Sequence, residues 1–308
     1  MSLAFLYAGQ GSQHPGMGAD LYEAYPVFKE ILDSADMDFD LKAVSFTDPD
    51  GVLNQTQYTQ PCMVAFAAGM TAILAGLGIT PDYAAGLSLG EYSALQAAGV
   101  FTPQQAISLA AFRGKAMASA CAGMACGMTA VLGLDREKLQ QACDQASDLG
   151  VVEIANYNCP GQLVIAGQKD AVDKASALAK ELGAKRCLPL KVSGPFHTSL
   201  LRPAGDALRE KFKEIPFGTP KFPVLFNCLG HEMGPEDTIP ALLEKQVQSS
   251  VYMEDTIRRL EALGVDTIVE IGPGKALSGF VKKTAPSIKT YAVETCADID
   301  ALSAALKG

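Results

Sequence analysis

The sequence predicts an α/β protein with a mainly parallel sheet and a small ferredoxin-like subdomain inserted into it. Two observations carry this prediction. Strand-like apolar runs alternate with helical patterns along most of the chain, as parallel α/β layers require. Between residues 128 and 192, two β-α-β units follow one another, which matches the β-α-β-β-α-β plan.

Nine segments are expected to form strands. They are residues 3–9, 83–88, 128–134, 151–158, 162–168, 185–192, 223–229, 266–272 and 289–294. Helical patterns fill most of the gaps, and the helices that follow 134 and 168 open with short polar segments containing Asp. We therefore expect a large domain formed by residues 1–121 and 193–308, with a small subdomain at 122–192.

The composition narrows the class of protein. The chain has 308 residues and a formal net charge of −9, which does not favour a nucleic-acid or anionic-membrane surface. Its eight cysteines are scattered singly, without a CxxC pair or a Cys/His cluster, so we expect reduced thiols and no metal site. The N-terminus lacks the basic region of a signal peptide. These features predict a cytoplasmic protein.

Residues 62–79 carry no charge and reach the lower length limit for a membrane span. The segment is rich in Gly and Ala, however, and no basic residues flank it. We therefore expect a buried core helix and no membrane association.

The segment Gly86-Leu87-Ser88-Leu89-Gly90 follows a strand-like run and precedes a helical pattern. In a Gly-x-Ser-x-Gly motif, the strand-to-helix turn projects the serine hydroxyl, and the next amide faces the developing oxyanion. This context favours Ser88 as a nucleophile. The alternative is a helix cap in which Ser88 and Glu91 form a capping box.

A serine nucleophile needs a base, and the chain has three histidines. His197 follows a strand end where a helix begins, which is where sites gather in α/β proteins. His14 lies in a Gly-rich segment and His231 in a polar turn, so both are more typical of loop residues. No carboxylate stands out as a third group, so a backbone carbonyl or an amide side chain would orient the histidine.

Residues 102–120 predict a buried helix that opens with a capping box of Thr102 and Gln105. Arg113 interrupts its apolar face, which is formed by Ala106, Leu109, Ala110 and Met117. A buried guanidinium needs an anion, because an unpaired buried charge costs about 3–5 kcal/mol. That anion is either Glu91, in an internal salt bridge, or a carboxylate of the substrate.

Six motifs together resemble the malonyl-CoA:acyl carrier protein transacylase family. They are "GQGSQ", "GLSLGEYSAL", "FRGKAM", "NYNCPGQLVIAG", "GPFHTSLL" and "EIGPGKAL", and they span nearly the whole chain in family order. The resemblance implies an α/β-hydrolase-like core with an inserted ferredoxin-like subdomain. One departure is Leu87, which stands where the family commonly has a histidine.

The resemblance also implies roles for single residues. Ser88 would accept the acyl group, and His197 would be its base. The amides of Gln10 and Leu89 would form the oxyanion hole, and Arg113 would bind the malonyl carboxylate. Two further roles complete the set: the main chain of Gln246 would orient the histidine, and Phe196 before it accompanies malonyl selection.

We therefore expect transfer of a malonyl group from malonyl-CoA to the phosphopantetheine thiol of acyl carrier protein, through a Ser88 acyl-enzyme, for fatty-acid synthesis. Exchange of a thioester for an ester and back needs no cofactor and no metal. The partners expected are malonyl-CoA and acyl carrier protein, with the enzyme acting as a monomer. The alternatives are a discrete acyltransferase of a polyketide synthase and a serine acyl hydrolase.

Overall fold

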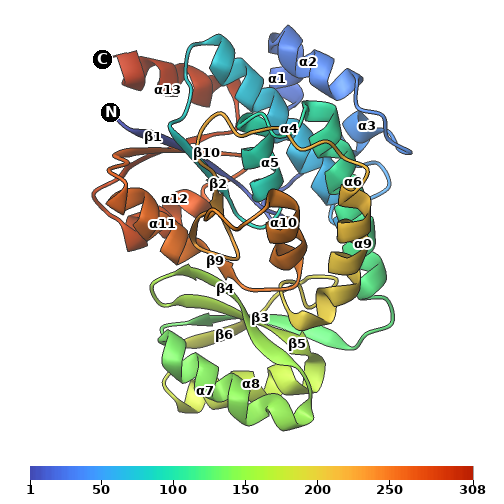
Figure 1. Ribbon diagram of the computed structural model, residues 1–308, viewed down its shortest axis with the longest axis vertical. Coiled ribbons are helices and arrows are strands. Elements are labelled where there is room, and N and C mark those ends of the chain that lie inside the picture. The colour runs from blue at the N-terminus through green and yellow to red at the C-terminus, as the bar shows by residue number, and fades with distance from the viewer. Residues whose placement is uncertain (308) are drawn as a thin grey trace. The chain divides into compact units, whose positions relative to one another are not determined.

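The computed structural model describes residues 1–307, and its contacts divide the chain into two compact units (Figure 1). Unit 1 comprises Met1–Gly114, Phe217–Leu225 and the chain from Arg258 onward. Unit 2 comprises Lys115–Pro216 and Phe226–Ile257. Each unit combines segments that are distant in sequence, as an inserted domain requires.

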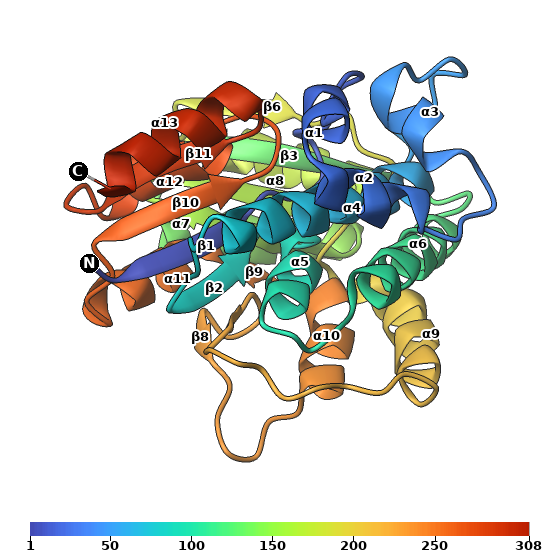
Figure 2. The same cartoon turned by 90° about the horizontal axis from the view of Figure 1, so that it is seen from above.

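Unit 1 is built on a parallel sheet with the strand order β11-β10-β1-β2. The strands are β1 (Leu3–Tyr7), β2 (Tyr83–Gly86), β10 (Thr267–Ile271) and β11 (Lys289–Val293). Figure 2 shows β1, in blue, between β10 and β2. Every residue of β1 and β10 is buried, which explains the wholly apolar or aromatic sequence of β1 and the mainly apolar sequence of β10. The predicted α/β fold with a parallel sheet is confirmed.

Unit 1 contains several helices, and some of them contact the strands of this sheet. The helices are α1 (Ala19–Ala24), α2 (Pro26–Asp33), α3 (Leu41–Phe46), α4 (Thr56–Gly76), α5 (Gly90–Ala97), α6 (Pro103–Ala120, which continues into unit 2), α12 (Ala276–Thr284) and α13 (Cys296–Lys307). Helix α5 contacts β1 and β2, while α12 and α13 contact β11. The predicted capping box opens α6: the Gln105 amide donates to Thr102 Oγ1 at 3.2 Å, and the Thr102 amide donates to Gln105 Oε1 at 2.9 Å.

Helix α4 contains most of the uncharged segment that the sequence shows at 62–79. Its length and composition would allow it to cross a membrane, but 78% of its apolar stretch is buried inside the structure. Helix α4 contacts α2, α3, α5 and β10. It is therefore the core helix that the sequence predicts.

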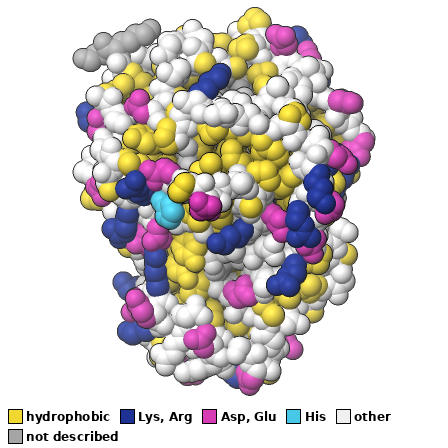
Figure 3. All heavy atoms as spheres, in the orientation of Figure 1, with side chains coloured by type: hydrophobic (Ala, Val, Ile, Leu, Met, Phe, Trp, Pro, Cys, Tyr) yellow, Lys and Arg dark blue, Asp and Glu magenta, His cyan; other side chains and the backbone are white. Residues whose placement is uncertain are grey.

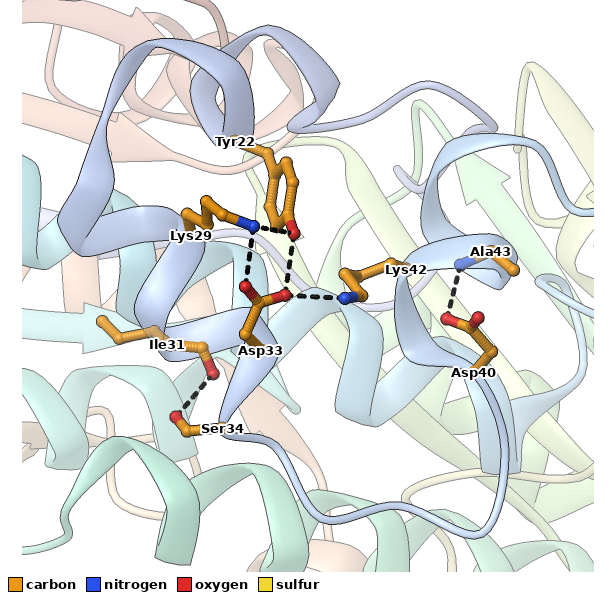
Figure 4. A network of polar contacts seen from close by, with 8 residues as sticks. All are labelled: Tyr22, Lys29, Ile31, Asp33, Ser34, Asp40, Lys42 and Ala43. Carbon is orange, nitrogen blue, oxygen red and sulfur yellow. Dashed lines mark hydrogen bonds and ion pairs between the residues drawn. The ribbon is translucent and has the colours of Figure 1, made fainter.

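The surface of unit 1 carries a polar network that joins α1, α2 and α3 (Figure 4). The carboxylate of Asp33 accepts hydrogen bonds from Lys29 Nζ at 2.8 Å, Lys42 Nζ at 2.6 Å and Tyr22 Oη at 2.8 Å. These hydrogen bonds hold the pKa of the Asp33 carboxyl below its usual range, and the bond from Lys29 has the largest effect. Such exposed contacts contribute little to stability. On the face drawn in Figure 3, basic side chains are interspersed with acidic ones.

Unit 2 contains a second sheet, with the order β6-β3-β5-β4-β9. Its strands are β3 (Cys126–Leu132), β4 (Val152–Cys159), β5 (Gln162–Gln168), β6 (Arg186–Pro189) and β9 (Val251–Tyr252). The first four pair antiparallel in the order β6-β3-β5-β4, which is the arrangement of the β-α-β-β-α-β plan. Helices α7 (Arg136–Ala146) and α8 (Lys169–Glu181) share one apolar cluster with these strands.

The two helices of this plan begin differently. Asp135 caps α7 by accepting the amide of Lys138 at 2.9 Å. No side chain caps α8, where Asp170 lies within the first turn instead. The remaining elements of the fold are η1 (Ser147–Leu149), η2 (Ser199–Leu201), α9 (Arg202–Phe212), β7 (Leu225–Phe226), β8 (His231–Glu232), α10 (Ile239–Val247) and α11 (Met253–Ala262).

Two predicted strands are shorter than expected. The segment 223–229 forms only β7 and an isolated parallel bridge from Val224 to Ala84, because a turn follows in which the Phe226 carbonyl accepts the amides of Leu229 and Gly230. The segment 185–192 forms a strand only over Arg186–Pro189. The domain boundaries 1–121, 122–192 and 193–308 stay a prediction, while the second compact unit also takes in 193–216 and 226–257.

Candidate active site

Ser88 lies in the turn between β2 and α5, in a conformation that serine rarely adopts. Its φ is +53°, in the left-handed region, whereas a helix-capping serine has extended backbone. The residue at the cap of α5 is Leu89, whose side chain makes no capping bond. The capping-box alternative is therefore wrong. The strained turn that a nucleophile elbow requires is present.

The two glycines of the motif allow the strand, the turn and the helix to approach closely. A Cβ atom at Gly86 would lie 2.0 Å from the carbonyl carbon of Gly90. A Cβ atom at Gly90 would lie 2.2 Å from the carbonyl oxygen of Tyr7 on β1. Such distances exclude a side chain at either position, so the Gly-x-Ser-x-Gly spacing follows from packing.

Arg113 projects from α6 toward the serine. Its Nη2 donates to Ser88 Oγ at 3.2 Å, and its Nη1 donates to Gln60 Oε1 at 2.9 Å. Arg113 is 1% exposed. The apolar residues predicted to share its helix face are also buried, namely Ala106, Leu109, Ala110 and Met117. Gly114 lets α6 approach α4, since a Cβ there would lie 2.7 Å from the carbonyl oxygen of Thr56.

Gln60 is a site residue that the sequence analysis missed. It lies fully buried on α4 and donates from Nε2 to Gln10 Oε1 at 3.5 Å. Gln10 Nε2 donates in turn to Thr56 Oγ1 at 3.0 Å. Arg113 binds Ser88 directly, and the Gln60 side-chain amide links Arg113 to Gln10. The three predicted residues therefore lie in one chain of hydrogen bonds. A glutamine near the start of an apolar helix is the signal that could have revealed it.

The charge of Arg113 is set by competing effects. Burial lowers the pKa of its guanidinium, while the neighbouring Tyr92 and Glu91 raise it. The guanidinium carbon lies 5.5 Å from the centre of the Tyr92 ring. Burial also raises the pKa of Tyr92. Because Glu91 lies close enough to act on Arg113, both the internal ion pair and the substrate carboxylate stay open as its anion.

His197 belongs to unit 2, where it lies between β6 and η2. Its φ is +61°, which is also left-handed, and the residue is 4% exposed. Its Nδ1 lies 2.9 Å from the carbonyl oxygen of Gln246 at the end of α10. A carbonyl only accepts, so Nδ1 carries a proton and donates it to Gln246, and in the neutral ring Nε2 is the nitrogen that accepts. The structure thus brings the predicted residues His197 and Gln246 together through this hydrogen bond.

The other predicted residues are placed as follows. Phe196 is 7% exposed, next to His197, and its ring lies close to Gly194. Leu89 is buried at the start of α5. His14 and His231 are both exposed: His14 pairs with Glu294, and His231 lies in β8. Among the described residues, no cluster of His, Cys, Asp and Glu could hold a metal ion.

Known proteins resemble the whole chain. Residues 4–300 match the family described as acyl transferase domain. The malonyl CoA-acyl carrier protein transacylase of Bacillus subtilis is 42% identical over 294 residues, which cover 94% of this chain and 93% of the relative. The transacylase structure from Clostridium perfringens has a TM-score of 0.96 at 38% identity, covering 100% of this chain and 98% of that one.

A third similar structure is a malonyl-transacylase in complex with the acyl carrier protein of a type II polyketide synthase. It has a TM-score of 0.95 at 37% identity, covering 99% of this chain and 100% of that chain. The match thus extends over both compact units and over all the motifs quoted above. This chain therefore belongs to the malonyl-CoA:acyl carrier protein transacylase family and is an acyltransferase.

Proposed function

We propose that this enzyme transfers a malonyl group from malonyl-CoA to the phosphopantetheine thiol of acyl carrier protein, through an ester on Ser88. The observation that carries the proposal is the Ser88 hydroxyl itself. It sits on a left-handed turn and accepts a hydrogen bond at 3.2 Å from a buried arginine. A hydroxyl presented beside a buried cation suits a substrate whose acyl group ends in a carboxylate.

In the first step, Ser88 Oγ attacks the thioester carbonyl while His197 Nε2 takes its proton. The amides of Gln10 and Leu89 stabilise the oxyanion of the tetrahedral intermediate. The carbon–sulfur bond then breaks, and the CoA sulfur leaves with the proton from the imidazolium. The Gln246 carbonyl keeps the imidazole in the tautomer that can accept a proton at Nε2.

In the second step, His197 deprotonates the thiol of the carrier, and the thiolate attacks the Ser88 ester. The carbon–oxygen bond breaks, and the serine oxygen regains its proton from the imidazolium. Both steps exchange an acyl group between sulfur and oxygen, without a change of oxidation state. The proposed reaction therefore needs no cofactor and no metal.

Arg113 gives the site its preference for a dicarboxylic acyl group. Its fork of N–H donors matches a carboxylate, whereas an acetyl group offers no partner to the buried charge. Phe196 is buried beside the base, and the resemblance to the family associates a phenylalanine at this position with malonyl selection. The free cysteines fit the reducing conditions of the cytoplasm, where we place this reaction.

Fatty-acid synthesis is the process we assign, and a polyketide synthase is the second candidate. The second candidate is supported by the similar solved structure of a malonyl-transacylase bound to the carrier protein of a type II polyketide synthase. Transfer rates to purified carrier proteins of each kind would separate the two assignments. A clear preference for the polyketide carrier would overturn fatty-acid synthesis as the process served.

A serine acyl hydrolase would use the same nucleophile and base. It would release malonate when malonyl-CoA is present without a thiol acceptor. We expect instead a stable acyl-enzyme and one equivalent of free CoA, followed by turnover only after carrier protein is added. Continuous malonate release without an acceptor would establish the hydrolase.

Intact mass spectrometry after mixing with malonyl-CoA tests the mechanism directly. We expect a malonyl adduct on the peptide that contains Ser88, none in Ser88→Ala, and acylation slowed by at least ~10² in His197→Ala. His231→Ala, an exposed histidine, serves as the matched control and should acylate normally. A stable malonyl adduct on another residue of the Ser88→Ala protein would show that Ser88 is not the acyl acceptor.

A further inference from the structure

The loop that carries His197 is strained. A left-handed φ is unfavourable for a residue other than glycine, so surrounding contacts must hold it in place. One such contact is internal, because Thr198 Oγ1 donates to the Pro195 carbonyl at 2.6 Å. Another is the bond from the imidazole to the carbonyl of Gln246. Both act on His197 from residues of unit 2.

A third contact holds the far side of the same loop. Glu153, half-buried on β4, receives two hydrogen bonds from Ser199, the second residue after His197. The Ser199 amide donates to Glu153 Oε2 at 2.9 Å, and Ser199 Oγ donates to Glu153 Oε1 at 2.6 Å. Both oxygens of the Glu153 carboxylate therefore accept charge-assisted hydrogen bonds from Ser199.

We propose that Glu153 is a positioning residue for His197, acting through Ser199. This inference rests on the function proposed above, in which His197 is the base. Strand β4 pairs with the central strand β5, and Glu153 lies opposite Ala166 in that pairing, so Glu153 is fixed to a regular element. The carboxylate ties the end of the loop to that element while the Gln246 carbonyl ties the imidazole. Together they keep the left-handed turn from relaxing to an unstrained backbone.

A residue with this role alters the chemical step and leaves substrate binding unchanged. Ser199→Ala removes one of the two bonds and keeps the negative charge. Glu153→Gln removes the charge and keeps a single acceptor oxygen. Glu153→Ala removes both bonds. Because one pair of residues makes both contacts, the effects of the variants should not add.

The experiment is single-turnover acylation of Ser88 by malonyl-CoA, followed by rapid quenching and intact mass spectrometry. We expect the maximal acylation rate to fall about three-fold in Ser199→Ala and Glu153→Gln, and about ten-fold in Glu153→Ala, a factor equivalent to ~1.4 kcal/mol. The malonyl-CoA concentration for half-maximal rate should stay the same. The double variant Glu153→Ala/Ser199→Ala should be no slower than Glu153→Ala.

A second probe separates positioning of the base from recognition of the substrate. A small alkyl fluorophosphonate needs the activated Ser88 hydroxyl but neither CoA nor a carboxylate, so its reaction should slow by the same factors. Glu181→Gln, the same substitution at the exposed end of α8, is the matched control and should react at the normal rate. If Glu153→Ala fails to fold, the exposed Ser199→Ala variant supplies the test.

Normal rates in both Ser199→Ala and Glu153→Gln would overturn the proposal. A raised half-saturating concentration with an unchanged maximal rate would also overturn it, because Glu153 would then act on the substrate. Failure of the underlying mechanism looks different. In that case His197→Ala itself would acylate at the normal rate.

Discussion

At the scale of single residues, the proposed mechanism assigns the choice of acyl group to Arg113. Nη2 of its guanidinium donates to Ser88 Oγ, while Nη1 donates to Gln60. Arg113 is almost wholly buried, so water does not screen the electrostatic interactions between its guanidinium and its partners. If the substrate supplies the anion of Arg113, an acyl group with a carboxylate is favoured over one without it.

Arg113→Ala should therefore lose malonyl transfer and gain relative acetyl transfer. A site built around a polar partner rejects an analogue that lacks it by about 10⁴-fold, and partial access of solvent reduces this factor. The measurement is the ratio of the Ser88 acylation rates with malonyl-CoA and acetyl-CoA. Arg113→Lys should restore only part of the preference, because an ammonium lacks the planar fork.

Arg209→Ala is the control for this prediction, because Arg209 is exposed and pairs with Glu244 on the surface of unit 2. Its ratio of malonyl to acetyl acylation should equal that of the unmodified enzyme. An unchanged ratio in Arg113→Ala would show that Arg113 is a structural residue, with Glu91 as its anion.

At the scale of elements, the elbow depends on how closely β1, β2 and α5 pack. Gly90→Ala would place a methyl group 2.2 Å from the Tyr7 carbonyl oxygen, so backbone must move. We expect the free energy of unfolding to fall by about 1–3 kcal/mol, together with loss of acylation. Denaturant unfolding of the purified variant measures the first effect.

Gly279→Ala provides the matched control within a helix. Gly279 lies inside α12, and nothing lies within 4 Å of a Cβ atom built there. This substitution should raise stability by about 0.5–1 kcal/mol, because alanine favours the helix more than glycine does. A Gly90→Ala protein as stable as the unmodified one would contradict the packing account of the motif.

The loop after β1, which contains Gln10, is linked to the end of β11 by His14. His14 Nδ1 lies 3.0 Å from the Pro15 carbonyl oxygen, and Nε2 contacts the Glu294 carboxylate. Two acceptors on one ring favour the doubly protonated imidazolium. The backbone bond to Pro15 and the bond to Glu294 accordingly raise the pKa of His14 above 6.5.

This pKa shift predicts a stabilisation that depends on pH. Because the folded pKa is raised, the contribution is complete below pH 6.5, the ordinary value, and is lost as the pH rises through the folded pKa. Both side chains are partly exposed, so we expect less than ~1 kcal/mol. The difference in unfolding free energy between the unmodified protein and His14→Gln should shrink as the pH rises.

Glu294→Gln removes the carboxylate that contacts His14 Nε2 and serves as the comparison for the pH series. In that background, the effect of His14→Gln on the free energy of unfolding should depend less on pH. A difference between His14→Gln and the unmodified protein that grows with pH would show that the neutral ring, and not the imidazolium, is stabilised.

At the scale of the whole molecule, the formal net charge of −9 disfavours self-association. We expect a monomer of 32.3 kDa at low ionic strength. Sedimentation equilibrium at several protein concentrations measures the mass. A concentration-independent mass of twice this value would contradict the expectation and would call for a search for a shared interface.

Local sequence determined much of this protein. The mainly apolar runs of β1 and β10 predict buried parallel strands, and the doubled β-α-β pattern predicts the strands β3 to β6 and the two helices of the second unit. Burial on one or both faces leaves a direct trace in the residues. Strand β9, which completes the second sheet, was not predicted. The spacing of Gly86, Ser88 and Gly90 predicts the elbow for a similar reason. Only glycine fits where backbones approach so closely.

Tertiary structure decided the contacts between segments that are distant in sequence. Gln60 reaches Arg113 across 53 positions, and Glu153 reaches Ser199 across 46. Neither pairing leaves a local pattern, because a hydrogen bond between two elements depends on how those elements pack and not on their own periodicity. The left-handed turn at His197 was likewise invisible in the sequence, since two of the contacts around its strained backbone come from the distant elements β4 and α10.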